Sequence, residues 1–428
     1  MSAPAPANDR QWPARRVVIT GMGAVASAGM NATALWEAMR EGRPSIAPLT
    51  LRDAPSPVLC LAGEVRGFDP LAHFDPKRLP LLDRVSQFAL VAAREAVAQS
   101  GIRWSADTAL NGRTAVIVGT GAGGECAHDE QSRKLYQAGS PRVHPLSILR
   151  VMANAPASHV GMEFGITGPT FGVTSACASA SHALAQAFAM VRSGQVDAAI
   201  AGGTEACLTY GMVKAWESMR VMADDACRPF CRQRRGMVLA EGAGMFVLEP
   251  LDDARHRGAP ILAELAGCGL SADASDVVFP SEVGAGHALT RALQDAGLDA
   301  SDVDYINAHG TGTIANDISE TRAIRRAFGK AADALSVSST KSIHGHALGA
   351  AGAIELIAAI NSLQHGIIPP TANFIDADPE CDLDYTPNVA RERTVRAALS
   401  NSFAFGGLNA VLALRQAEMA RGALKSRP

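Results

Sequence analysis

The sequence predicts an α/β protein made of two similar halves that meet near residue 260. Several runs of β-branched and small apolar residues end in glycine and alternate with helical segments such as 84–99 and 181–193, a pattern typical of buried strands in an α/β fold. Two distant segments also share a Ser-rich start, a run of small residues and an apolar helix that ends in glycine. They are "TSACASASHALAQAFAMVRSG" and "SSTKSIHGHALGAAGAIELIAAINSLQHG", and they indicate an internal duplication.

The predicted elements follow one another along the chain. The first segment, "RRVVITGMGAVASAGMNATALWEAMREG", predicts a strand, a glycine-rich turn and a helix capped by Asn31 or Thr33. Further buried strands are predicted in "RTAVIVGTGAGGE", "DAAIAGGTEACLTYG", "VDYINAHGTGT" and "NAVLALRQ". Residues 248–265 predict a surface helix followed by a new strand, which places the division between the halves there.

The overall composition disfavours several classes of partner. The formal charge is −3 at pH 7 and the isoelectric point is near 6.4, so there is no basic surplus for nucleic acid or an anionic membrane. Eight cysteines are scattered through 428 residues, which favours free thiols and a cytoplasmic location over a disulfide framework. Cys227 and Cys231 are separated by three residues and have no matching pair, so no metal site is expected there.

Two stretches resemble targeting or membrane segments but are predicted to be neither. Residues 1–16 are rich in Pro and Ala without an apolar region, and we expect a frayed leader to the first strand. Residues 164–191 carry no Asp, Glu, Lys or Arg and are long enough to span a membrane. Their Gly, Pro, Ser and Thr content, together with His182, instead predicts a buried strand, a turn and a helix.

Cys177 is the first candidate for chemistry. It lies where the strand-like "TFGVTS" passes into a helix-forming segment, so we expect its sulfur near a helix N-terminus. The unpaired N–H groups there favour a thiolate and lower the pKa of the thiol below its free value of ~8.5. The alternative is that Cys177 is a small, inert core residue, as most free cysteines are.

Histidines at two other strand ends support the first interpretation. His309 follows an apolar strand at the start of the glycine loop "HGTGT", and His344 and His346 lie in "STKSIHGHALGAAG". Neutral imidazoles at such positions donate hydrogen bonds to a developing oxyanion, and a helix N-terminus keeps them neutral. A lone histidine is more often structural, but two in loops of Gly, Thr and Ser favour a site.

These motifs resemble those of a known family. Cys177 in "TSACASAS", His309 in "NAHGTGT", Lys341 and His346 in "STKSIHGHALGAAGAIE", and the closing "SNSFAFGGLNAVLAL" are similar to the motifs of β-ketoacyl-acyl carrier protein synthases of the elongating, type II class. The resemblance runs from about residue 16 to 415, with the motifs in the family's order. Within the class, "TKSIHGH", "GIIPPTAN" and "CDLDYTPNVARER" resemble the nodulation protein E branch most.

The resemblance implies a fold and an activity. The fold is a thiolase fold, with two similar αβαβα halves that form a five-layered α-β-α-β-α core. Residues 16–260 form the half with the nucleophilic cysteine, and residues 261–416 form the half with the two histidines. Cys177 takes an acyl group as a thioester, and His309 and His346 assist decarboxylation of malonyl-acyl carrier protein and stabilise the enolate that attacks it.

The resemblance also implies supporting residues and partners. The backbone N–H groups of Cys177 and Phe405 form an oxyanion hole, and Lys341 and Glu355 support the histidines. The substrate-binding positions are Thr311, Thr313, Trp216 and Phe405, and the carrier-protein docking candidates are Lys77, Arg78, Arg84 and Arg220. Acyl carrier protein is the expected partner, a homodimer is the expected assembly, and no cofactor or metal is expected, since phosphopantetheine arrives on the carrier protein.

Three residues depart from the family's pattern. Ala404 and Leu408 replace Gly and Thr in the closing loop, which predicts a less flexible gate over the site. His344 stands where the elongating enzymes more often have Thr. It is expected to be either a spectator or a modest influence on the pKa of His346.

Other functions fit the sequence less well. "GMGAVA" after "RVVIT" satisfies a dinucleotide-binding fingerprint, but the next helix is predicted to begin near Asn31 or Thr33, too far from Gly23. A non-catalytic chain-length-factor subunit lacks the cysteine that this chain retains. Thiolases need a second cysteine near the C-terminus, and synthases that start from Coenzyme A generally have Asn in place of the second histidine.

Overall fold

The computed structural model describes residues 14–51, 58, 60–104 and 108–417. The leader predicted for residues 1–16 therefore lies almost entirely outside the described residues. Within them, the main sheet has ten strands in the order β11-β10-β14-β15-β9-β1-β8-β6-β4-β5. The first half of the chain supplies β1 (Val17–Ala26), β4 (Thr114–Gly119), β5 (Thr170–Val173), β6 (Ala198–Glu205) and β8 (Gly242–Pro250). The second half supplies β9 (Ala263–Ala272), β10 (Tyr305–Asn307), β11 (Ser336–Ser338), β14 (Ala397–Ala404) and β15 (Leu408–Arg415).

The two sets of five strands have the same topology. When the five strands of each half are numbered in chain order, both sets cross the sheet in the same order: third, second, fourth, fifth and first strand. In each set the third, second and fourth strands are parallel to one another, and the remaining neighbouring strands pair in antiparallel register. This confirms the duplication predicted from the sequence. Whether each half is a separate domain with a boundary near residue 260 stays a prediction.

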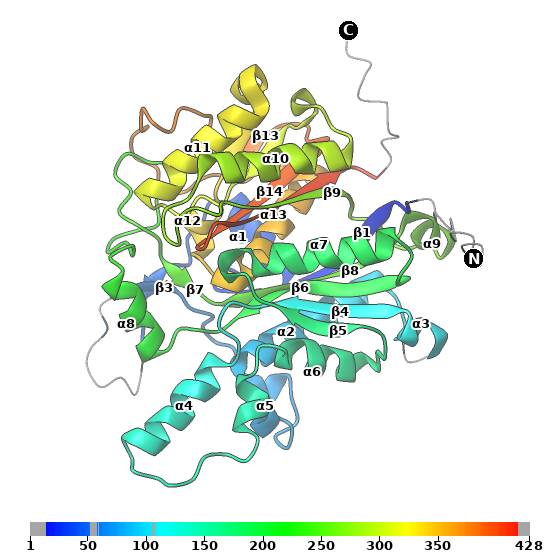
Figure 1. Ribbon diagram of the computed structural model, residues 1–428, viewed down its shortest axis with the longest axis vertical. Helices are drawn as coiled ribbons and strands as arrows, with labels where there is room; N and C mark the ends of the chain where they lie inside the picture. The colour runs from blue at the N-terminus through cyan, green and yellow to red at the C-terminus, as the bar shows by residue number, and fades with distance from the viewer. Residues whose placement is uncertain (1–13, 52–57, 59, 105–107, 418–428) are drawn as a thin grey trace, which may run out of the picture.

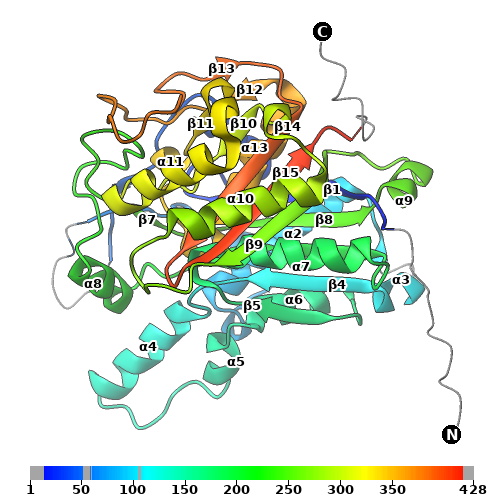
Figure 2. The same cartoon turned by 45° about the horizontal axis from the view of Figure 1, so that its top comes forward.

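Helices cover both faces of each set of strands, giving the five-layered thiolase fold (Figures 1 and 2). The central layer is formed by α7 (Ser179–Arg192) and α13 (Ala351–His365), which contact each other and both sets of strands. The outer layers are α2 (Arg84–Ser100) and α6 (Ala155–Phe164) on one side, and α10 (Glu282–Ala296) and α11 (Ile314–Phe328) on the other. The helices predicted at 84–99 and 181–193 are thus α2 and α7.

The two halves join through a short strand pairing. Val17, Val18 and Ile19 of β1 pair with β9 in antiparallel register. The carboxylate of Glu264 on β9 accepts hydrogen bonds from Arg16 at 3.0 Å and from Arg415 at 2.7 and 2.9 Å. Glu264 and Arg415 are each 2% exposed, so their ion pair within the second half is shielded from solvent, and the bond from Arg16 to Glu264 links the first half to it.

The prediction of a glycine-rich turn after the first strand is wrong. Residues 21–26 continue β1, which pairs with β8 through Gly21 and Gly23. A Cβ atom at Gly21 would lie 2.0 Å from the carbonyl oxygen of Ala96, and one at Gly23 would lie 2.1 Å from that of Ala92. The glycines therefore let α2 pack directly on the strand, and they form no loop for a dinucleotide.

The two central helices begin with matching turns. A 3-10 turn of three residues precedes each helix, Ala176–Ala178 before α7 and Leu348–Ala350 before α13. Each turn starts at a residue with positive φ, 48° at Ala176 and 42° at Leu348. These strained backbones lie next to Cys177 and close in sequence to His346, as strain at functional sites often does.

The remaining elements lie around this core. The helices are α1 (Ala32–Arg40), α3 (Thr108–Gly112), α4 (Glu125–Tyr136), α5 (Ser147–Val151), α8 (Tyr210–Ser218), α9 (Leu251–His256) and α12 (Lys341–His344). Asn31 caps α1 by accepting a hydrogen bond from the N–H of Ala34 at 2.8 Å, as predicted. The small sheets are β2 (Ala47–Pro48), β3 (Leu61–Gly63) and β7 (Leu239–Ala240), and β12 (Ile367–Ile368) with β13 (Arg391–Glu392). Among the described residues, no helix has the length and apolar character needed to cross a membrane.

Candidate active site

Three loops at one edge of the core bring the candidate side chains together. Cys177 lies in the 3-10 turn before α7, His309 follows β10, and His346 follows α12, which itself begins three residues after β11. Because β10 and β11 are parallel neighbours, the segments that leave their carboxyl ends emerge at the same edge of the sheet. The turn before α7 reaches this edge from the other half.

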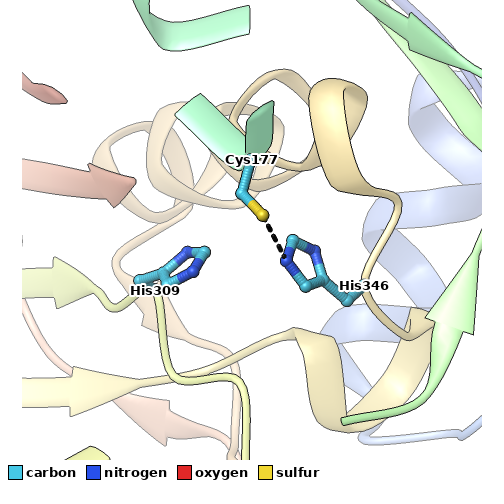
Figure 3. A group of neighbouring side chains, drawn as sticks. All are labelled: Cys177, His309 and His346. Atoms are coloured by element: carbon cyan, nitrogen blue, oxygen red, sulfur yellow. Dashed lines mark hydrogen bonds between the residues drawn. The ribbon is translucent and has the colours of Figure 1, made fainter. Parts of the chain in front are cut away.

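The sulfur and the two imidazoles form one cluster (Figure 3). The Sγ atom of Cys177 lies 3.1 Å from Nε2 of His346. The rings of His309 and His346 have centroids 5.3 Å apart and are nearly perpendicular, at 83°. All three side chains are buried, with relative exposures of 4%, 2% and 1% for Cys177, His309 and His346. The sequence motifs therefore converge on a single site.

A cavity of about 280 Å³ reaches this cluster from the surface. Its lining includes Cys177, His309 and His346, together with Phe403 and Phe405. Thr311, Thr313 and the mostly apolar segment 276–280 also line it, and Val277 and Phe279 of this segment are exposed. An apolar channel that holds a thiol and two imidazoles suits a long, largely uncharged ligand.

The prediction that Cys177 has a lowered pKa is wrong. Burial raises the pKa of the Cys177 thiol to about 12, and the negative charge of Glu205 acts in the same direction. The positive charge of Lys341 and the backbone N–H groups of Phe405 and Cys177 oppose this increase in pKa without overcoming it. The sequence shows that a helix follows Cys177, but it does not show how completely the sulfur is removed from water.

The histidines are neutral, as predicted, but for a different reason. Burial lowers the pKa of both His309 and His346 well below the usual range, and the positive charge of Lys341 lowers it further. Helix N-termini are not the main cause. Both imidazoles therefore remain neutral across the physiological pH range and are able to act as hydrogen-bond donors.

Lys341 and Glu355 form a buried ion pair behind His309. The Lys341 ammonium donates to the carbonyl oxygen of His309 at 2.6 Å, lies 3.4 Å from the ring nitrogen Nδ1 of His309, and pairs with the carboxylate of Glu355. Both side chains of the pair have no solvent exposure. Burial raises the pKa of Glu355 to about 7, opposed by the charge of Lys341. The pair holds the backbone of His309 and places a positive charge beside its ring.

Buried carboxylates that the sequence analysis did not single out also position the loops. Glu320 accepts hydrogen bonds from the N–H groups of His309 at 2.8 Å and Gly310 at 2.7 Å. Asp317, one turn earlier in α11, accepts from the N–H of Gly312 at 3.2 Å. Their signal in the sequence is an acidic pair three residues apart in the helix after "HGTGT". Glu205 similarly accepts from Gly121 and Gly349, linking the two halves at 2.7 and 2.9 Å.

The loop after β14 brings the backbone N–H of Phe405 to the sulfur of Cys177. Residues 405–407 connect β14 to β15, and Gly406 and Gly407 have φ values of 81° and 68° that favour glycine. The backbone N–H groups of Phe405 and Cys177 both lie near the sulfur and favour its anion. They occupy the positions expected for an oxyanion hole, whose role stays a proposal. The N–H of Gly406 donates to the carbonyl oxygen of Val277 at 2.8 Å, which fastens this loop to the cavity wall.

Two of the other three predicted substrate-binding residues line the cavity. Thr311 and Thr313 line it, with their hydroxyl groups 2.9 Å apart. Trp216 does not line it but packs against Phe405, with the two ring centroids 5.9 Å apart. Trp216 is therefore placed to affect the position of Phe405.

The predicted docking cations differ in their availability. Arg78 pairs with Glu163, and Arg84 donates to the buried Glu241 at 2.7 Å, so both are held by carboxylates of the same chain. These structural contacts disfavour Arg78 and Arg84 as docking residues. Lys77 and Arg220 are exposed and remain candidates.

His344 does not line the cavity. Its Nε2 lies 3.1 Å from the hydroxyl oxygen of Thr340, and the ring is 1% exposed. Burial lowers the pKa of His344 to about 3. The effect of His344 on the pKa of His346 is a lowering, smaller than the effects of burial and Lys341. Ala404 lies on the cavity wall and Leu408 opens β15, but their predicted effect on gating stays a prediction.

Comparison with known families agrees with this geometry. The β-ketoacyl synthase N-terminal domain matches residues 14–254, and the β-ketoacyl synthase C-terminal domain matches residues 262–375. Nodulation protein E of Rhizobium sp. (strain N33) is 50% identical over 402 residues, covering 94% of this chain and 99% of that protein. 3-Oxoacyl-[acyl-carrier-protein] synthase 2 of Staphylococcus aureus (strain COL) is 40% identical over 411 residues, with the same coverage.

Solved structures show the same fold. The ishigamide ketosynthase/chain length factor superposes with a TM-score of 0.88 at 36% identity, covering 94% of this chain and 99% of that chain. A type II polyketide ketosynthase, solved in complex with its acyl-carrier protein and bound to the hexaketide, gives a TM-score of 0.85 at 29% identity and covers 94% of this chain and all of that chain. The matched domains, the relatives and the shared architecture show that this chain belongs to the β-ketoacyl synthase family of condensing enzymes.

Proposed function

We propose that this protein is a 3-oxoacyl-[acyl-carrier-protein] synthase, an acyltransferase that joins an acyl group held on Cys177 to malonyl-acyl carrier protein with loss of carbon dioxide. The observation that carries the proposal is the contact of 3.1 Å between Sγ of Cys177 and Nε2 of His346, with His309 beside it in one cavity. A thiolate is both a strong nucleophile and a good leaving group, and the reaction needs both properties at one atom.

In the first half-reaction, Cys177 becomes acylated. Because burial raises the pKa of its thiol to about 12, the sulfur needs a proton acceptor as it attacks the incoming thioester. His346 is the ring in contact with it, and its neutral Nε2 accepts the proton and returns it to the departing carrier thiol. The N–H groups of Cys177 and Phe405 stabilise the negative oxygen of the tetrahedral intermediate.

In the second half-reaction, the malonyl group loses carbon dioxide. The bond to its carboxylate breaks, and the electron pair forms an enolate whose oxygen accepts hydrogen bonds from His309 and His346. For His346 this role needs a proton on Nε2, so a change of tautomer separates the two half-reactions. The enolate carbon then attacks the acyl carbonyl, the tetrahedral oxyanion collapses to the ketone, and the Cys177 thiolate leaves and takes up a proton from water.

A non-catalytic chain-length-factor subunit is the alternative. One structural relative is described as a ketosynthase/chain length factor, so the fold accommodates both roles. The complete Cys177, His309 and His346 cluster, open to a cavity, supports the catalytic role. A subunit that only shapes a partner's pocket has no use for a nucleophile paired with an imidazole.

We also propose acyl carrier protein as the partner, a homodimer as the assembly and the cytoplasm as the location. A type II polyketide ketosynthase of the same fold has been solved with its acyl-carrier protein, which supports the first. The homodimer is supported by the edge strand β5, where Phe171 is 36% exposed, and by exposed apolar side chains on the neighbouring α5 and α6. These are Ile148, Leu149 and Met162. Free cysteines throughout the described residues are compatible with a reducing compartment.

Acylation of Cys177 tests the proposed function. Incubation with an acyl-acyl carrier protein is expected to add the mass of the acyl group to the peptide that contains Cys177. Mass spectrometry of the digested protein measures this, and Cys207→Ala, which removes a buried cysteine of the same apolar cluster, is the control and should still be acylated. An unmodified Cys177 in folded wild-type protein would favour the non-catalytic alternative.

Alkylation kinetics test the protonation state of the resting thiol. Only the thiolate reacts with iodoacetamide, so a thiol with a raised pKa should react about tenfold faster for each pH unit, up to about pH 10. Peptide mapping follows Cys177 separately from the other cysteines. A rate that is already level below about pH 7 would mean a low pKa and would contradict the raised pKa that burial gives to Cys177.

Measuring the oligomeric state tests whether the exposed edge of the sheet at β5 forms the dimer interface. Sedimentation of the wild-type protein should give a dimer, and Phe171→Asp, which places a charge on β5, should raise the dimer dissociation constant by at least about tenfold. Val389→Asp is the matched control, because Val389 is 74% exposed and lies in the second half of the chain, between β12 and β13 of a separate small sheet. A monomeric wild type, or equal effects of the two variants, would contradict the proposed interface.

A further inference from the structure

We propose that Cys177, His309 and His346 also form a binding site for Zn²⁺, and that the bound ion reversibly blocks the nucleophile. One ligand atom from each residue lies within 4.8 Å of the others, and no second group of three His, Cys, Asp or Glu residues with this spacing was found in the part of the chain that the structure describes. The inference concerns binding alone and does not depend on the proposed reaction.

The ligand atoms need only small movements to surround an ion. Tetrahedral Zn²⁺ with bonds of 2.3 Å to sulfur and 2.0–2.1 Å to nitrogen places neighbouring ligand atoms about 3.3–3.6 Å apart. Sγ of Cys177 and Nε2 of His346 are already 3.1 Å apart. His309 lies beside this pair (Figure 3), and its ligand atom is within 4.8 Å of the other two, so an ion requires this contact to open slightly and the His309 ring to turn toward it.

Each ring has a nitrogen that can serve as a ligand after a change of tautomer at His309. Nδ1 of His309 lies 3.4 Å from the ammonium of Lys341 and accepts from it, so Nε2 carries the ring proton in the resting site. When Nε2 binds the ion, the ring proton moves to Nδ1, and the ammonium keeps its contacts with the carbonyl oxygen of His309 and with Glu355. Nε2 of His346 faces the sulfur, and its Nδ1 is buried without a hydrogen-bond partner. The nearby charge of Lys341 disfavours a cation, but its ion pair with Glu355 offsets that charge.

The ligand atoms and the cavity favour Zn²⁺ over other divalent ions. One thiolate and two neutral imidazoles suit Zn²⁺, whereas Mg²⁺ and Ca²⁺ prefer oxygen ligands. Three protein ligands leave a fourth position facing the cavity, where water completes the tetrahedron. As the ion binds, the thiol of Cys177 gives up its proton to water and its electron pair to the metal. The sulfur is then no longer free to attack a thioester.

Metal titration of the full-length, chelator-treated protein tests the inference. Co²⁺ is the spectroscopic probe and is expected to bind one ion per chain with sulfur-to-cobalt charge-transfer absorption, which Zn²⁺ then removes by displacement. Cys177→Ala should abolish the charge-transfer band and weaken Zn²⁺ binding by at least about 100-fold, since changes even outside the ligand set cost 10- to 100-fold. Cys207→Ala, a buried cysteine outside the cavity, should leave both unchanged.

A second measurement keeps the inference testable if a variant folds poorly. Saturating Zn²⁺ should protect Cys177 of the wild-type protein from iodoacetamide, and Mg²⁺ should not. Far-UV circular dichroism reports whether each variant is folded. Binding that survives Cys177→Ala, or Zn²⁺ that fails to protect Cys177, would overturn the proposed site whether or not the protein condenses acyl chains.

Discussion

The contact between the Cys177 sulfur and the His346 imidazole is the constraint on which the site depends. The two residues come from different halves of the chain, and they meet only because the central helices α7 and α13 pack against each other between the two sets of strands. The same burial that creates the contact removes both groups from water. It raises the pKa of the thiol and lowers that of the imidazole, so the resting pair is neutral.

Buried charges elsewhere hold this arrangement in place. Glu205 bridges the loop at Gly121 to the turn at Gly349, and Glu320 holds the backbone of His309. Lys341 reaches the same loop from the opposite side. A carboxylate satisfied by several backbone N–H groups is costly to displace, so these residues act as rigid supports for loops that would otherwise be mobile.

Much of the architecture can be predicted from the sequence, and the predictions that are wrong have physical causes. The alternation of strands and helices and the repeated small-residue helices predict the two halves, and the motifs predict that Cys177, His309 and His346 converge. The turn expected after the first strand is absent because Gly21 and Gly23 serve helix packing within a strand, which local sequence does not distinguish from a loop. The pKa of Cys177 and the ion pairs of Arg78 and Arg84 depend on contacts between distant segments, which local sequence reasoning does not supply.

Release of carbon dioxide from malonyl-acyl carrier protein tests most directly whether the sulfur and the imidazoles share one cavity with separate roles. The account predicts that Cys177→Gln, which cannot form an acyl thioester, still decarboxylates the malonyl group without condensation. Adding His309→Ala to that variant should slow decarboxylation by about 10² to 10³, the usual cost of removing one oxyanion donor. A folded Cys177→Gln protein without decarboxylation, or a rate indifferent to His309, would contradict it.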